Sequence, residues 1–258
     1  MKKNKVLLSF DVEEFDLPRE HGDKITLKKG VEVSSQGLET ILEILEETKV
    51  RVTFFVTGNF ASLRPEMVKK MERAGHEVAC HGVDHFKPSK SDVAESKKII
   101  EKITRKPVKG YRQPRMFKID YHELKRCDYK YDSSVNPAFI PGRYNNFRVP
   151  RKPYKKSGVI ELPTSVATFI RVPLFWLALH LFPKRIYLSL VKSTLNTQGY
   201  FATYFHPWEF VDLGRFKVVP WYIQKNSGEN LADRLKWLIN ELKQEKNDFI
   251  TYSEFLGV

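Results

Sequence analysis

Two histidines, His81 and His85, lie four positions apart in the stretch CHGVDH, directly after an apolar run. Imidazole nitrogens are common ligands of zinc, and on a helical turn this spacing places both rings on one face. The pair alone leaves two interpretations open: a metal site, or two unrelated histidines. A catalytic metal also needs a third protein ligand and an open position for water, so other parts of the chain must supply them.

Two carboxylates, Asp11 and Glu13, follow the apolar segment KVLLSF in the stretch DVEE. Residues two apart in an extended chain point to the same side, so both can face one site. One carboxylate can bind the ion while its neighbour accepts a proton from the attacking water. The alternative is a solvated acidic turn, which the directly preceding apolar strand makes less attractive.

Two further residues fit the hydrolysis of an amide. His206, in FHPWEF, can deliver a proton to the leaving nitrogen, because its pKa lies near neutrality. Arg112, in YRQP, can hold and orient a catalytic aspartate through paired hydrogen bonds. The alternatives are a strand-end histidine bonded to the backbone and an ordinary surface arginine.

The elements that must position these residues alternate between strands and helices. Apolar and period-two patterns predict strands over 5–11, 51–58, 76–82, 108–114, 129–134, 158–165, 200–210 and 248–256. Helical spacing predicts helices over 37–49, 65–75, 91–104, 120–127 and 230–245, with a mostly helical stretch up to about 198. Seven or eight such units favour an α/β fold, a distorted (β/α) barrel of about seven strands, in one domain spanning residues 1–258. The candidate residues follow strand ends, so we expect them at one mouth of the barrel.

Composition and charge restrict the functional classes. The 258 residues carry a net charge of +13, which favours polyanions, but no nucleic-acid-binding motif accompanies the basic residues, so we expect no nucleic-acid partner. The two cysteines, Cys80 and Cys127, suit a reducing compartment. Acidic residues interrupt the first apolar stretch after about five residues, short of the ~7–15 of a signal peptide, so we expect a cytoplasmic location.

Taken together, the motifs resemble those of the polysaccharide deacetylases, the NodB-like domains of carbohydrate esterase family 4. In the family's order they are SFDVEE, TFFVTG, HEVACHGVDH, GYRQP, YDSS and YFHPWEF, and the resemblance extends over almost the whole chain. The last motif is similar to the variant found among exopolysaccharide-cluster deacetylases. The resemblance implies a distorted barrel of the NodB type and a metal-dependent hydrolase that removes N-acetyl or other N-acyl groups from amino sugars.

The resemblance also implies a role for each matching residue. Asp11 is the general base, Arg112 orients it, and His206 is the general acid. The metal ligands are Glu13, His81 and His85, and the implied ion is Zn²⁺ or another divalent cation such as Co²⁺, Mn²⁺ or Ni²⁺. The residues assigned to substrate binding are Pro114, Arg115 and Trp208, the backbone N–H after Pro114 serving the oxyanion.

The chain departs from the commoner family pattern at two places. Val12 stands where a second aspartate is usual, so Glu13 becomes the ligand and Glu14 a lesser rival for that role. The aspartate that often pairs with the acid histidine is missing from DSSVNP, which leaves Glu161 and Glu209 as candidate partners of His206.

The substrate itself is less defined. A cytoplasmic location favours a precursor or a lipid-linked glycan of cell-surface polysaccharide synthesis over a wall polymer. The segment 171–195 has an apolar core of about 11 residues, too short to span a bilayer, followed by basic residues. It predicts either a helix packed on the barrel or peripheral contact with an anionic membrane on its inner face. Rival activities are a deformylase, an allantoinase-like amidase or a non-catalytic glycan- or lipid-binding protein.

Overall fold

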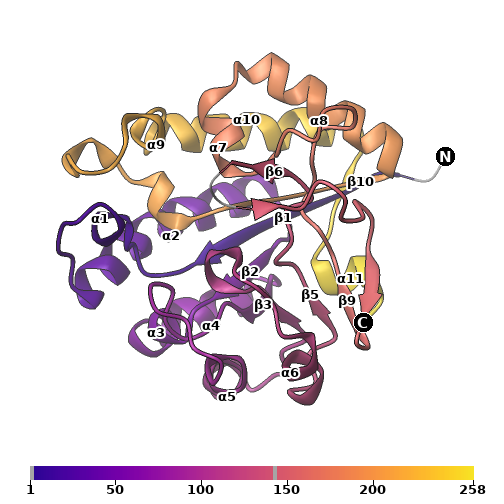
Figure 1. Ribbon diagram of the computed structural model, residues 1–258. Helices are drawn as coiled ribbons and strands as arrows, with labels where there is room; N and C mark the ends of the chain where they lie inside the picture. The colour runs from indigo at the N-terminus through magenta and orange to yellow at the C-terminus, as the bar shows by residue number, and fades with distance from the viewer. Residues whose placement is uncertain (1–2, 142–143) are drawn as a thin grey trace.

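A computed structural model describes residues 3–141 and 144–258, and a single curled sheet organises them (Figure 1). The order of its strands is β10 (Tyr200–Phe205), β1 (Lys5–Val12), β2 (Thr53–Val56), β3 (Glu77–Cys80), β4 (Gly110–Tyr111), β5 (Tyr131–Asp132), β9 (Val159–Glu161) and β8 (Tyr154–Lys156). The neighbours from β10 to β9 are parallel, and β8 is antiparallel to β9. A short strand, β11 (Asp248–Phe249), also pairs with β1 in parallel. The predicted α/β fold with a parallel sheet is confirmed.

The two outer strands of the parallel part of this path, β10 and β9, are connected through Ser165, four residues beyond β9. Its backbone N–H donates to the carbonyl of Ala202 on β10 at 2.8 Å, and its hydroxyl accepts from the Ala202 N–H at 2.9 Å. One residue thus joins β9 to β10 where a regular barrel would have a strand ladder. The sheet is therefore a distorted barrel with an irregular seam.

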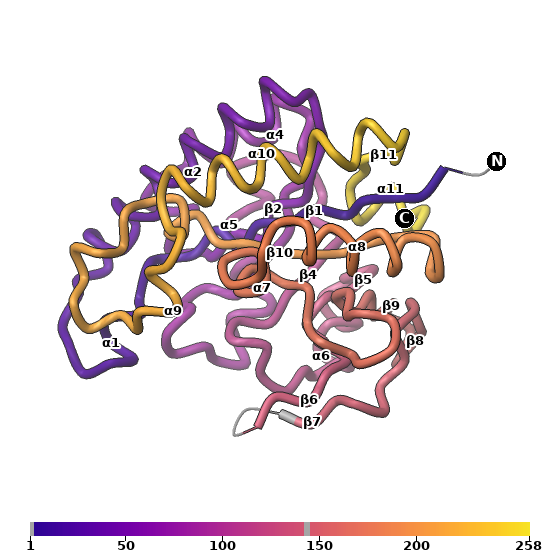
Figure 2. Tube along the Cα trace, turned by 90° about the horizontal axis from the view of Figure 1, so that it is seen from above, coloured from indigo at the N-terminus to yellow at the C-terminus, as the bar shows by residue number. Residues whose placement is uncertain are grey.

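Helices surround the sheet. In Figure 1, α7 (Trp176–Leu181), α8 (Lys184–Gln198) and α10 (Glu229–Gln244) lie on one side of it, and α3 (Gly58–Leu63), α4 (Pro65–Arg73), α5 (Asp92–Thr104) and α6 (Tyr121–Arg126) on the other. The long helix α2 (Leu27–Thr48) packs beside α10 (Figure 2). The short helices α1 (Leu17–Glu20) and α9 (Trp221–Gln224) lie at the end opposite the chain termini in both views. A hairpin of β6 (Phe139–Ile140) and β7 (Tyr144–Asn145) projects from the periphery (Figure 2).

Strand register brings the candidate residues together. Phe10 pairs with Phe205, so the next residues, Asp11 near the end of β1 and His206 directly after β10, lie side by side. Cys80 pairs with Tyr111, so His81 and Arg112 follow at the same edge. Parallel strands place such residues at the carboxyl ends of the sheet, which is where (β/α) barrels carry their sites.

Three predicted elements differ from the structure. The strand predicted over 200–210 ends with β10 at Phe205, and Pro207–Phe210 form a 3-10 helix. The strand predicted over 248–256 is only β11, and it is followed by the helix α11 (Tyr252–Leu256). A capping box between Thr251 and Glu254 starts this helix and overrides the apolar pattern. The helix predicted over 37–49 begins ten residues earlier, because the Thr26 hydroxyl caps it by accepting from the Lys29 N–H.

The segment 171–195 packs against the barrel. Leu174, Leu179, Tyr187 and Val191 are buried in the main hydrophobic core. Within residues 3–141 and 144–258, every helix is too short or too polar to cross a bilayer. The packing interpretation of this segment is confirmed, while its contact with a membrane surface stays a prediction.

Candidate active site

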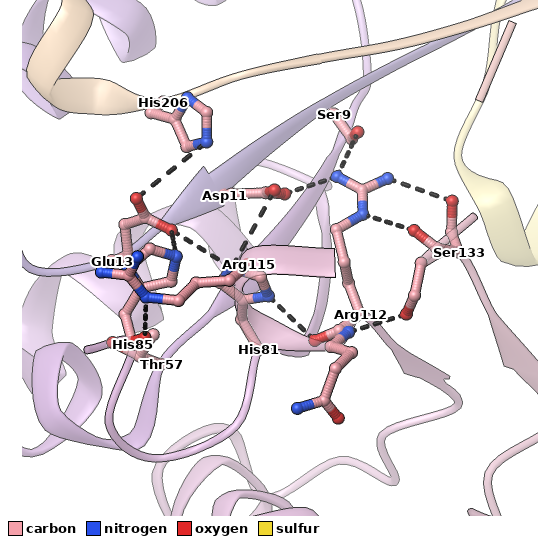
Figure 3. Close-up of polar contacts among 12 residues, drawn as sticks. Ser9, Asp11, Glu13, Thr57, His81, His85, Arg112, Arg115, Ser133 and His206 are labelled. Atoms are coloured by element: carbon pink, nitrogen blue, oxygen red, sulfur yellow. Dashed lines mark hydrogen bonds and ion pairs between the residues drawn. The ribbon is translucent and has the colours of Figure 1, made fainter. Parts of the chain in front are cut away.

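Asp11 and Arg112 form an ion pair at the mouth of the barrel (Figure 3). The Arg112 guanidinium is fully buried and also donates to the Ser133 carbonyl at 2.8 Å, the Ser9 hydroxyl at 3.1 Å and the Tyr252 hydroxyl at 3.3 Å. Burial alone would lower the pKa of Arg112, but the negative charge of Asp11 outweighs it and raises that pKa. The arginine is therefore a fixed cation that holds Asp11 in one orientation.

Glu13, His81 and His85 converge beside this ion pair. Glu13 Oε2 lies 3.2 Å from His81 Nε2 and 3.0 Å from His85 Nε2, and all three side chains are buried. Residues 81–85 form a loop rather than the helical turn inferred from their spacing. Gly82 turns this loop with φ +67°, and a Cβ there would lie 2.8 Å from Pro114 Cγ. The close packing of this loop on Pro114, and not helical periodicity, brings the two rings together.

Hydrogen bonds fix which nitrogen of each ring faces Glu13. His81 Nδ1 donates to the Arg112 carbonyl at 2.9 Å, since a carbonyl only accepts. His85 Nδ1 lies 2.9 Å from Asp16 Oδ2. Both Nε2 atoms therefore point at one carboxylate, and ligand atoms of the three residues lie within 4.8 Å of one another. Two imidazoles and a carboxylate with carboxylate- and carbonyl-bound outer nitrogens fit a divalent cation such as Zn²⁺.

The pKa shifts in this cluster follow from the same arrangement. Burial alone would raise the pKa of Glu13, but the neighbouring His85, His206 and His81 outweigh it and lower that pKa. Burial would lower the pKa of His85, but Glu13 and Asp16 outweigh it and raise that pKa to about 9. Both directions follow from the close approach of carboxylates and imidazoles in this cluster.

His206 lies on the other side of Glu13, with Nε2 4.0 Å from Glu13 Oε1 (Figure 3). Its Nδ1 is 2.7 Å from Glu209 Oε1, so Glu209 is its partner. The other candidate, Glu161 at the end of β9, instead accepts from the Tyr121 hydroxyl at 3.0 Å. Burial would lower the pKa of His206, but Glu13 and Glu209 outweigh it and raise that pKa. The ring is thus anchored at Nδ1 and has Nε2 directed to the pocket.

The predicted substrate-binding residues have different surroundings. Trp208 is buried, its indole N–H donates to Glu13 Oε1 at 3.0 Å, and its ring stacks on His206 with centroids 4.7 Å apart. The guanidinium of Arg115 pairs with Asp16 at 3.3 Å and Glu20 at 2.7 Å. Trp208 and Arg115 both line the pocket, so their assignment to the substrate stays a prediction. Among other aromatic residues whose rings could stack on a sugar, Phe15 and Tyr111 are buried in the core, and Trp221 is 71% exposed.

Glu14, the rival metal ligand, has a structural role. It accepts from the Thr57 hydroxyl at 2.8 Å, the Asn59 amide at 3.0 Å and the His85 backbone N–H at 3.0 Å. These three donors belong to the segments around the site, and together they occupy both carboxylate oxygens of Glu14. Glu14 therefore positions the His85 loop and leaves the ligand role to Glu13.

The site opens into a cavity of about 230 Å³. Several of its lining residues were missed by sequence reasoning: Asp16, Asn136, Phe175, Trp176, Tyr204 and Tyr222. Asp16 could have been found, since it continues the acidic run that begins at Asp11. Phe175 and Trp176 could not, because they lie in an apolar segment whose pattern reads as core.

Known proteins with similar sequences support the family resemblance of the motifs. Residues 1–131, just over half of the chain, match the family model described as polysaccharide deacetylase. A chitooligosaccharide deacetylase of Bradyrhizobium sp. (strain ANU 289) is 38% identical over 55 residues, which are 21% of this chain and 25% of that protein. The chain thus spans about a quarter of the length of this relative, and 21% and 35% of two others.

Solved structures match nearly the whole fold. A protein described as a polysaccharide deacetylase from Mycobacterium smegmatis superimposes with a TM-score of 0.67 at 21% identity, covering 99% of this chain and 90% of that one. Puue allantoinase superimposes with a TM-score of 0.65 at 14% identity, covering 97% and 88%. At these identities the likeness concerns the fold.

Proposed function

Because this chain belongs to the polysaccharide deacetylase family, we propose that it is a metal-dependent hydrolase that removes an N-acetyl or other N-acyl group from an amino sugar. One observation carries the proposal. Glu13, His81 and His85 converge within 4.8 Å beside Asp11 on one side and His206 on the other, all lining one cavity. A metal site flanked by a carboxylate and a histidine is suited to hydrolysing an amide.

Glu13, His81 and His85 would hold the ion, Zn²⁺ or another divalent cation such as Co²⁺, Mn²⁺ or Ni²⁺. A divalent cation bound there supplies a Lewis acid that polarises the acyl carbonyl and makes water more acidic. Asp16 and the Arg112 carbonyl hold the outer nitrogens of the two histidines and so keep the ligand nitrogens directed inward.

Asp11 acts as the general base. It lies 3.9 Å from His81 Nε2, beside the ligands, and Arg112 fixes its orientation. Asp11 accepts the proton of the attacking water while the water oxygen forms a bond to the acyl carbon. The family resemblance assigns the backbone N–H of Arg115, directly after Pro114, as a donor to the oxygen that becomes negative.

His206 acts as the general acid. Its Nδ1 is held by Glu209, so Nε2 delivers the proton to the sugar nitrogen as the C–N bond breaks. The products are a carboxylate and a free amino sugar. Asp11 and His206 face the metal ligands from two sides, which allows one group to take a proton and the other to give one.

The substrate we propose is a precursor or lipid-linked glycan of cell-surface polysaccharide synthesis, handled in the cytoplasm or on the inner membrane face. The net charge of +13 supports attraction to an anionic surface or a phosphorylated carrier. Phe169 and Ile170, 87% and 66% exposed, precede the segment 171–195 and could contact lipid.

The alternative activity is a C–N hydrolysis of another kind, by a deformylase or an allantoinase-like amidase. This alternative is retained because the fold is similar to that of an allantoinase. A non-catalytic glycan- or lipid-binding role is less favoured, because the base, the acid and three ligands are all present.

The test begins with metal content and then measures products. We expect protein purified without chelator to hold about one divalent ion per chain, and His81→Ala and Glu13→Ala to lose it. The loaded enzyme should then release acetate from N-acetylated glucosamine oligomers or lipid-linked sugars. Formate or a ureido acid as the product would favour the alternative. Failure to bind zinc, cobalt or manganese at all would overturn the hydrolase mechanism.

A further inference from the structure

His180 is a fully buried histidine to which the mechanism above assigns no role. It lies on α7, within the apolar segment 171–195. The ring of Trp176 packs nearly perpendicular to the rings of both His180 and His206, with centroids 5.7 and 5.5 Å away. His180 is therefore one aromatic ring away from the general acid, on an element that lines the cavity.

Both ring nitrogens of His180 face oxygen atoms. Nδ1 lies 2.8 Å from the Lys225 carbonyl, and Nε2 lies 2.8 Å from Glu209 Oε2. A carbonyl can only accept, so Nδ1 carries a hydrogen. A neutral imidazole has a single N–H, so one further proton must lie between His180 Nε2 and Glu209 Oε2. This bond is therefore either an imidazolium donating to a carboxylate or a carboxylic acid donating to an imidazole.

Glu209 is consequently held at both oxygens. Oε1 receives the backbone N–H of His206 at 2.5 Å and its Nδ1 at 2.7 Å, while Oε2 faces His180. Without a partner at Oε2, this fully buried carboxyl group would keep an unsatisfied oxygen and could rotate to find another donor. Rotation of Glu209 would release Nδ1 of His206.

The backbone around His180 is itself anchored. Asn226 donates to the His180 carbonyl at 2.6 Å, and Arg234 on α10 donates to the Leu179 carbonyl at 2.8 Å. These bonds satisfy carbonyls near the end of α7. They also hold the backbone in the position from which the His180 ring contacts Glu209.

We propose that His180 is a positioning residue that holds Glu209 and, through it, keeps the His206 ring oriented with Nε2 toward the scissile nitrogen. The proposal rests on the proposed function, because it assigns His206 the general-acid role. It gives the segment 171–195 a part in catalysis, since α7 supplies both a wall of the cavity and the support of the acid.

Two isosteric variants separate the two bonds of His180. The amide nitrogen of His180→Gln can reach the position of Nε2 and keep the bond to Glu209. The amide nitrogen of His180→Asn can reach the position of Nδ1 and keep only the bond to Lys225. We expect kcat for an N-acylated sugar to fall about 10- to 100-fold in the asparagine variant with KM unchanged, the size typical of lost supporting contacts. The glutamine variant should remain within about threefold of the wild type.

A substrate that needs no proton at its leaving group provides the internal control. On p-nitrophenyl acetate, whose phenolate departs without protonation, both variants should match the wild type. Equal losses on amide and ester, or losses that follow a lowered Tm in both variants, would show a merely structural role and overturn the proposal.

A measurement independent of activity keeps the inference separate from the proposed function. Long-range ¹H–¹⁵N correlation of the histidine rings reports which nitrogen carries the hydrogen. At a pH high enough for the His206 ring to be neutral, we expect it to be held as the Nδ1–H tautomer in the wild type and the glutamine variant, and to become a mixture of tautomers in the asparagine variant. The wild type should also show an exchange-protected proton on the His180–Glu209 bond, and Glu209→Ala should remove it.

The possible results have distinct meanings. If the ring signals respond as expected but no N-acylated substrate is hydrolysed, the proposed function fails while the positioning of His206 by His180 stands. If the wild-type His180 lacks the shared proton, or the asparagine variant leaves His206 unchanged, the inference is wrong whatever the activity. If the asparagine variant does not fold, the presence or absence of the shared proton in the wild type still tests the inference.

Discussion

Two clusters at the mouth of this barrel are built on one plan, a buried carboxylate between two histidines. In the first, Glu13 faces His81 and His85 at 3.2 and 3.0 Å. In the second, Glu209 faces His206 and His180 at 2.7 and 2.8 Å. The residue types and distances are nearly the same, yet the two clusters serve different chemistry.

The difference lies in where the remaining ring nitrogens point. In the Glu13 cluster, the outer nitrogens of His81 and His85 are bound to the Arg112 carbonyl and to Asp16, so the inner nitrogens converge on one point. In the Glu209 cluster, His180 is bound at both nitrogens and only His206 keeps one directed to the pocket. Convergent nitrogens suit a metal ion, whereas a single available nitrogen suits proton transfer.

The largest effect should come from removing a convergent nitrogen. We expect His81→Ala to lose the bound divalent ion and about 10³-fold in amide hydrolysis, since the metal supplies several kcal/mol of transition-state stabilisation. Elemental analysis and acyl-group release measure the two losses. His122→Ala, at an exposed position of α6, is the matched control and should change neither. Stoichiometric metal in the His81 variant would refute the ligand assignment.

Removing the proton donor should separate the two clusters. We expect His206→Asn to lower amide hydrolysis about 10²- to 10⁴-fold, the range of general acid–base catalysis, while metal content stays at the wild-type level. Hydrolysis of p-nitrophenyl acetate should fall far less. Loss of metal from this variant would mean that the clusters are one unit and that His206 is a ligand.

A smaller effect is expected from the support of a ligand. Asp16→Asn weakens the hold on His85 Nδ1, so metal affinity should fall about 10- to 100-fold in a chelator competition. Glu20→Gln is the control, because Glu20 binds the same Arg115 but not His85. Equal losses in both variants would show that Arg115, and not Asp16, organises this side.

The smallest effect concerns a third carboxyl cluster that has no histidine. Burial and the adjacent charge of Asp132 raise the pKa of Glu161 well above its usual 4.5. Burial also raises the pKa of Asp132. A raised folded-state pKa means that the stability from the bound proton is complete below the unfolded pKa and is lost as pH rises through the folded pKa.

The Tm of the wild type should therefore decline as pH rises from 4 toward neutrality. The Tm of Glu161→Gln should decline less, and each kcal/mol of unfolding free energy that the variant retains should correspond to about 2–4 °C. Thermal unfolding followed across this pH range measures the difference. Glu39→Gln removes the same charge at an exposed position of α2 and should follow the wild type. A parallel decline in all three proteins would show that the Asp132–Glu161 pair titrates normally.

Sequence reasoning identified the Glu13 cluster more completely than the Glu209 cluster. Asp11, Glu13, His81 and His85 occur in short motifs at strand ends, so strand periodicity alone brings them to one edge. Glu209 could only be offered beside Glu161 as a partner for His206. His180 gave no signal, because a single histidine in an apolar helical stretch has the pattern of a core residue.

Some elements were wrong or incomplete for related reasons. The stretch 248–256 has the apolar pattern of a strand, but a capping box of two side chains makes most of it helical. The start of α2 was missed because Gly30 and Gly37 weaken a helical pattern. Gly37 is needed there, since a Cβ would lie 1.8 Å from the Pro207 carbonyl oxygen, and this contact packs α2 on the turn that carries His206.

The sequence by itself determined the alternation of strands and helices and the order of the motifs along it, because periodicity and punctuation are local properties. It also determined which groups could bind a metal, accept a proton or donate one, since those are properties of the side chains. Only the tertiary structure decided which carboxylate serves which histidine and which ring nitrogen is left available. Hydrogen-bond partners such as the Arg112 and Lys225 carbonyls come from distant segments, so their positions depend on packing that no local pattern records.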